Sequence, residues 1–92
     1  MIALNVKVDT HRQHIEVPQG EFRVYREDDR YMVGRVPDGA LLGFFRLELT
    51  TSGKVGVKSH CVGQLGLGTF DEARELLDVI GRAAFEHGIA SA

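Results

Sequence analysis

Apolar and polar residues alternate along most of the first sixty positions of the chain. One side of an extended backbone carries Ile2, Leu4, Val6 and Val8. The same period of two returns in four later stretches, at 22–25, 31–36, 41–50 and 55–62. Turn-forming residues separate these stretches, and the alternation is typical of strands with one buried face. The pattern predicts an antiparallel meander of four to six strands, in which residues 10–18 form either a short strand or a loop.

A different period begins after position 68. Thr69 and Glu72 match a capping box, in which the Thr69 hydroxyl accepts from the Glu72 amide and the Glu72 carboxylate reaches back. Apolar residues then recur at intervals of three and four, at Ala73, Leu76, Leu77, Ile80 and Ala84. This stripe is typical of an amphipathic helix, and Gly88 is expected to end it. We predict one helix over residues 69–87.

These elements define the expected architecture. The chain has 92 residues, of which 43% are apolar, enough for a single core. We expect one α+β domain over 1–92, with a strand region at 1–62, a Gly-rich connection at 63–68 and the helix at 69–87. Because sheet and helix each have one apolar side, the C-terminal helix should pack on one face of the antiparallel sheet.

Charge and cysteine content narrow the setting in which the protein acts. The formal net charge is −2, with nine Lys/Arg against eight Asp/Glu in residues 1–62 and two against five in residues 69–92. The sheet half is thus slightly basic and the helix half acidic. A single cysteine, Cys61, fits a reducing compartment. The sequence shows no signal peptide and no apolar run near the ~20 residues of a membrane span, so we expect a cytoplasmic protein that does not enter membranes.

Few residues suggest catalysis, metal binding or a cofactor. The Gly-rich stretch 63–68 before a helix resembles a phosphate loop, but it lacks the Lys of a Walker motif and a following parallel strand. We expect it to be a connection that places Leu65 and Leu67 in the core. His60 and Cys61 are adjacent and so should point to opposite faces of a strand, with Cys61 in the core. We expect no catalytic residues, no metal site and no cofactor.

The sheet face away from the helix is the most informative surface. If Met32, Gly34 and Val36 point toward the core, their neighbours Tyr31, Val33 and Arg35 point outward. One interpretation is a plain solvated surface, on which the aromatic side chains only brace their cross-strand neighbours. Otherwise, two sets of outward residues suggest two kinds of site. An apolar partner-binding patch would comprise Val33, Leu42 and Phe44, with Phe85 exposed on the polar side of the helix. A nucleic-acid surface would comprise Arg23, Tyr25, Tyr31, Arg35, Arg46 and Lys58, because basic and aromatic side chains hold phosphates and stack bases.

The junction between the last strand and the helix is similar to one known domain. Three strands followed by Gly68-Thr69-Phe70-Asp71-Glu72-Ala73 resemble the DNA-binding domain shared by plant ethylene-response factors and some phage integrases. That domain has a three-stranded sheet and one packed helix. The similarity covers the helix start only, the chain carries an additional N-terminal strand, and we assign no family.

We therefore expect a non-enzymatic binding module that acts through protein–protein contact. It would act as a homodimer or as a small regulator or inhibitor, of a kind common in bacterial and phage genomes. The first alternative is binding of single-stranded nucleic acid or DNA through the basic and aromatic sheet face. The second is an enzyme whose site is assembled from distant residues, for which His60 and Glu48 are the only candidates.

Overall fold

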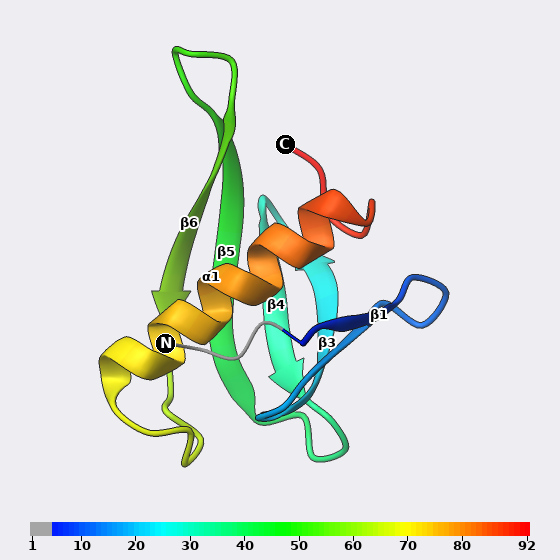
Figure 1. Cartoon of the computed structure of the whole chain (residues 1–92), viewed down its shortest axis with the longest axis vertical. Helices are drawn as coiled ribbons and strands as arrows, with labels where there is room; N and C mark the ends of the chain where they lie inside the picture. The colour runs from blue at the N-terminus through cyan, green and yellow to red at the C-terminus, as the bar shows by residue number, and fades with distance from the viewer. Residues whose placement is uncertain (1–4) are drawn as a thin grey trace.

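In the part of the chain that the structure describes, six antiparallel strands form one sheet in chain order, and a single helix follows them (Figure 1). The structure is a computed structural model that describes residues 5–92. The elements are β1 (Lys7–Asp9), β2 (His14–Val17), β3 (Gly20–Glu27), β4 (Arg30–Arg35), β5 (Leu41–Leu49), β6 (Val55–Cys61) and α1 (Phe70–Glu86). The expected α+β meander with one C-terminal helix is thus confirmed, with six strands. The expected apolar positions Ile2 and Leu4 lie outside the described residues.

The helix has defined signals at both ends. At its start, the Glu72 amide donates to Thr69 Oγ1 at 3.2 Å and the Thr69 amide donates to Glu72 Oε1 at 3.1 Å, which confirms the capping box. At its end, Gly88 has a φ of 76°. The amides of Gly88 and Ile89 donate back to the carbonyls of Phe85 and Ala84, the pattern of a Schellman motif. Among the described residues, no helix is long and apolar enough to cross a membrane.

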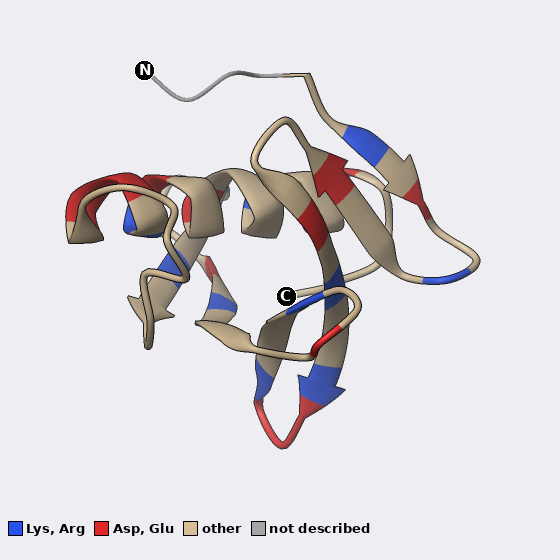
Figure 2. Cartoon of the chain, turned by 90° about the horizontal axis from the view of Figure 1, so that it is seen from below, with Lys and Arg blue, Asp and Glu red and all other residues tan. Residues whose placement is uncertain are grey.

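The sheet curves around the helix, so its two faces have different roles. We call the concave side that α1 covers the inner face and the opposite side the outer face (Figure 1 and Figure 2). Fully buried side chains from the inner face and from α1 together make the core: Ile15, Phe22, Val24, Val33, Phe45, Leu76, Leu77 and Ile80. Cys61 and the partly buried Leu65 and Leu67 also pack there, as expected.

The helix approaches the sheet most closely at two glycines. A Cβ added to Gly43 in β5 would lie 2.2 Å from the carbonyl oxygen of His60 and 2.7 Å from Leu77 Cδ2. A Cβ added to Gly81 in α1 would lie 2.8 Å from Val57 Cγ1. Real Cβ atoms do not come this close to other atoms, so both positions require a residue without a side chain.

The expected orientation of β4 was wrong. Val33 pairs with the buried Val24 and with Gly43, which places it on the inner face with Tyr31 and Arg35. Met32 pairs with Tyr25 and Phe44 on the outer face. Apolar residues occupy consecutive positions in this strand, so alternation alone does not fix which set faces the helix. Cross-strand pairing decides it, and Tyr31 and Val33 are buried in the core.

Leu42 was also placed wrongly on the exposed face. The pairing of β4 with β5 shifts between Val33 and Gly34, so that Val33 faces Gly43 whereas Gly34 faces Leu41. Leu42 is the additional residue in this irregularity, and a β-bulge redirects side chains in this way. Its side chain is fully buried in the core.

Candidate ligand-binding face

Four neighbouring strands place side chains in one row across the outer face. In register, Tyr25 of β3 pairs with Met32 of β4, Met32 with Phe44 of β5, and Phe44 with His60 of β6. We call Tyr25, Met32, Phe44 and His60 the outer row. Met32 is only 6% exposed although no helix covers this face, whereas Tyr25 and Phe44 are half-buried and His60 is exposed. The row is thus a cross-strand ridge with planar groups on both sides of a buried methionine.

Guanidinium groups lie on the rings of the outer row. The ring of Phe44 stacks on His60 with 5.0 Å between centroids and 21° between planes. Arg30 lies 4.4 Å from the Phe44 ring centroid, and Arg23 lies 5.0 Å from that of Tyr25. Because Arg30 comes from β4 and His60 from β6, they flank Phe44 from opposite sides. Cation–π contacts of this kind hold the planar groups in a defined orientation.

The cations of this face differ in their carboxylate partners. Arg46 lies 3.7 Å from Asp29, and Lys58 lies 3.7 Å from Glu48. Both pairs are exposed, so each stabilises the fold by at most about 1 kcal/mol and can open. Within residues 5–92, no carboxylate forms an ion pair with Arg23 or Arg30. These two guanidinium groups therefore keep their charge available to a ligand.

Two shallow hollows flank the buried Met32, each of about 290 Å³. The first, which we call the Gly34 hollow, is lined by His14, Arg23, Tyr25, Gly34, Arg35, Val36, Pro37 and Gly39. The second, which we call the His60 hollow, is lined by Phe44, Arg46, Glu48, Lys58, Ser59 and His60. Each hollow thus combines at least one aromatic ring with cationic side chains.

The turn beside the Gly34 hollow is fixed by Arg35. Its guanidinium donates to both carboxylate oxygens of Asp38, at 3.1 and 2.5 Å, and to the carbonyl of Leu65 at 3.3 Å. Asp38 also accepts from the Ala40 amide at 3.1 Å. Arg35 was expected to contact nucleic acid, but its guanidinium is instead engaged in holding this turn. The hydrogen bonds from Arg35 and Ala40 lower the pKa of Asp38 to about 2.

The lowered pKa of Asp38 gives a testable pH dependence. Because the folded-state pKa lies below the ordinary value of 3.8, the contribution of the pair to stability is present above about pH 4 and lost as the pH falls through about 2. We expect the Asp38 carboxyl carbon to titrate near 2 by NMR, and near the ordinary value in Arg35→Gln. Equal midpoints in the two proteins would show that Arg35 does not hold the carboxylate.

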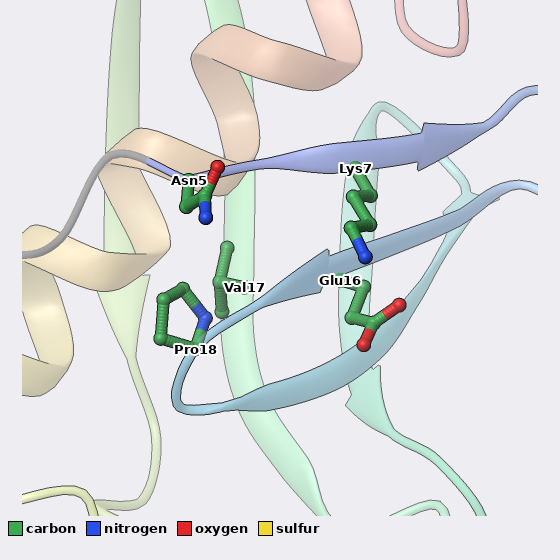
Figure 3. Close-up of a pocket in the computed structure, with 5 residues that line it drawn as sticks. All are labelled: Asn5, Lys7, Glu16, Val17 and Pro18. Atoms are coloured by element: carbon green, nitrogen blue, oxygen red, sulfur yellow. The ribbon is translucent and has the colours of Figure 1, made fainter.

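Besides a small hollow of about 200 Å³ over β1 and β2, whose lining includes His14 but no Phe or Tyr, two further hollows lie at the N-terminal edge of the sheet. One, of about 240 Å³, is bordered by Asn5, Lys7, Glu16, Val17 and Pro18, and Lys7 and Glu16 are cross-strand partners in β1 and β2 (Figure 3). The other, of about 440 Å³, lies between Val6 and the helix residues Asp78, Val79, Arg82, Ala83, Glu86 and His87. The first has no aromatic ring, and the second has only an exposed histidine with charges of both signs at its rim. Neither repeats the combination found on the outer row.

The remaining expected site residues are dispersed. Tyr31 is buried, and its hydroxyl accepts from the Ser91 amide at 3.1 Å, so it offers no surface to a ligand. Phe85 is partly buried near the end of α1, on a different element from Phe44. Of the nucleic-acid set, Arg23, Tyr25, Arg46 and Lys58 do lie on the outer face. Met32 and Arg30 were not expected there, and only the pairing of β4 reveals them.

Other chemistry is sparse in the part of the chain that the structure describes. Residues 5–92 contain no group of three or more His, Cys, Asp or Glu side chains that could hold a metal ion. Burial raises the pKa of the Cys61 thiol, and the thiol donates to the Gly63 carbonyl at 3.4 Å. A buried thiol with a raised pKa is a poor nucleophile at neutral pH.

Comparisons with known proteins leave the function to be argued from the site. No family model matches the chain, and neither a curated protein nor a solved structure matches it.

Proposed function

We propose that the protein is a non-enzymatic binding module whose outer row binds single-stranded nucleic acid. The observation that carries the proposal is the alternation of planar rings with guanidinium groups, Arg23 on Tyr25 and Arg30 on Phe44. Neither guanidinium group has a carboxylate partner among residues 5–92. Proteins that bind single strands without strong sequence preference use this combination: bases stack on aromatic rings, and cations along the same groove hold the phosphates.

The distribution of charge gives such a ligand one favoured side. Figure 2 shows acidic residues on the first turn of α1, where Asp71 and Glu72 lie. Phosphates are repelled from that region, whereas Arg23, Arg30, Arg46 and Lys58 lie around the outer row, where Arg46 and Lys58 form exposed ion pairs with Asp29 and Glu48. A net charge of −2 is therefore compatible with binding at a single face, although it favours a modest affinity that depends strongly on salt.

A protein partner is the alternative on the same face. The expected apolar patch needed Val33 and Leu42, and both are fully buried, so only Phe44 of its sheet residues remains accessible. Arg, Tyr and Met are also frequent in protein interfaces, and an apolar contact through Phe44 would show little salt dependence. Salt dependence therefore separates the two ligands.

The test is the affinity for a fluorescent single-stranded octanucleotide, measured by anisotropy between 50 and 200 mM salt. If two to four cations contact phosphate, the logarithm of the binding constant should fall against the logarithm of salt with a slope of about −1.4 to −2.8. Arg23→Ala and Arg30→Ala should each weaken binding and reduce that slope by about 0.7.

Arg74→Ala, on the exposed surface of α1, is the matched control and should leave both affinity and slope unchanged. Absence of binding at the lowest salt would refute the proposal. If the protein instead associates with itself independently of salt, Phe44→Ala should abolish the association. That result would show that the ligand of the outer row is a second copy of this protein and not nucleic acid.

A further inference from the structure

A second row of side chains runs parallel to the outer row, two residues away from it along each strand. It consists of Arg30 in β4, Arg46 in β5 and Lys58 in β6, and we call these three residues the cation row. Arg46 pairs directly with Lys58. Tyr31 pairs with Phe45, so the antiparallel register places Arg30 beside Arg46. Three positive charges thus lie side by side on neighbouring strands.

The cation row and the outer row share one face of the sheet. Each cation is two residues from the outer-row residue of its own strand, and side chains at this spacing point to the same side. The backbones of the two rows are about 7 Å apart, because a strand rises about 3.4 Å per residue. The Arg30 guanidinium lies 4.4 Å from the Phe44 ring centroid, and Arg46 and Lys58 border the His60 hollow with that ring. Positive charge therefore follows one side of the aromatic surface across three strands.

Two carboxylates offset the repulsion within the cation row. Like charges on neighbouring strands destabilise a sheet. Asp29 lies 3.7 Å from Arg46, and Glu48 lies 3.7 Å from Lys58. Both cations nevertheless remain accessible, because their side chains are 55% and 74% exposed. Exposed ion pairs of this length are weak, so the phosphate group of a ligand can take the place of either carboxylate.

We infer that a single strand crosses β4, β5 and β6 with its phosphates along the cation row, and that the two carboxylates weaken its binding by competing for these cations. The sugar–phosphate backbone then runs across the strands of the sheet, beside the rings on which bases stack. Glu27 of β3 pairs with Arg30 and places a negative charge at that end, so the phosphate path ends at β4. This inference rests on the proposed function, since it assigns a path to the ligand on the same face.

The first test is the salt dependence of octanucleotide binding in Arg46→Ala and Lys58→Ala, measured by anisotropy. Each variant loses one phosphate contact, so the slope of the logarithm of the binding constant against the logarithm of salt should become shallower by about 0.7. The affinity should fall about 2- to 5-fold. Arg74→Ala, on the exposed surface of α1, is the control and should change neither quantity.

The second test looks for a gain of binding, which a misfolded protein would not produce. Asp29→Asn and Glu48→Gln each free one cation with little change in side-chain size, and each should strengthen binding about 2- to 5-fold. Glu75→Gln removes the same charge from the exposed surface of α1 and is the matched control. At 150 mM salt its affinity should stay within about 1.5-fold of that of the unmodified protein, because exposed charges more than about 8 Å apart are largely screened.

Three results would contradict these expectations. Gains in the two carboxylate variants no larger than that of Glu75→Gln would overturn the inference. Unchanged affinity and slope in the Arg46 and Lys58 variants would also overturn it, and weakened binding by Arg23→Ala would then leave the proposed function standing. Failure of the unmodified protein to bind the octanucleotide at the lowest salt would instead refute the proposed function.

Discussion

Replacement of Gly43 by alanine is expected to lower the free energy of unfolding by about 3 kcal/mol or more. The added methyl group would lie 2.2 Å from the carbonyl oxygen of His60, 2.7 Å from Leu77 Cδ2 and 3.1 Å from Cys61 Cα. Two of these atoms belong to the backbone of β6, so the clash cannot be relieved by a side-chain rotation. Strand β6 would have to separate from β5, or α1 from the sheet.

Thermal and denaturant unfolding followed by circular dichroism measure this effect. In a domain of this size, each kcal/mol shifts the melting temperature by about 4–8 °C. Gly56→Ala in the neighbouring strand has room for the methyl group and should change stability by less than about 1 kcal/mol. A Gly43→Ala protein as stable as the Gly56→Ala protein would contradict the described packing of α1 on β5 and β6.

Replacement of Phe44 by alanine is expected to weaken binding of single-stranded DNA by about 5- to 150-fold, the loss typical of one stacked base. The substitution removes the ring between Arg30 and His60, so both lose the group that orients them. Because Phe44 is half-buried on the face without a helix, we expect a smaller effect on stability than for a residue of the core such as Phe45.

Anisotropy with an octanucleotide at low salt measures the loss, and Phe70→Ala supplies the control. Phe70 is 49% exposed at the start of α1, so it is an accessible phenylalanine outside the outer row. Its removal should leave the affinity unchanged. Equal losses in the two variants would show that binding is not localised at the outer row.

Much of the fold could be predicted because local signals agreed with the tertiary structure. The capping box at Thr69, the apolar stripe of the helix and Gly88 fixed α1 within a residue at each end. Alternation in β3 placed Phe22 and Val24 inside, as observed. The orientation of β4 was predicted wrongly because its apolar residues are consecutive. The side chain of Leu42 was placed on the wrong face because a β-bulge reverses its direction. Both depend on pairing with other strands, which a single strand does not encode.

The candidate site was predictable only in part for the same reason. Residues on strands with clear alternation, such as Arg23 and Tyr25, were assigned to the outer face correctly. The errors came from β4, where Tyr31, Val33 and Arg35 were exchanged with Met32, and from Leu42 at the bulge of β5. The Gly34 hollow lies beside the turn that the Arg35–Asp38 contact holds, and strand alternation does not predict that contact.

An NMR titration of the isotope-labelled protein with a deoxycytidine octamer tests the central claim most directly. The account predicts amide and aromatic shift changes that centre on Tyr25, Met32, Phe44 and His60. It predicts unchanged signals along the exposed side of α1, at Arg74 and Asp78. Changes centred on α1, or no changes at millimolar protein and low salt, would contradict the assignment of the outer row as a nucleic-acid-binding face.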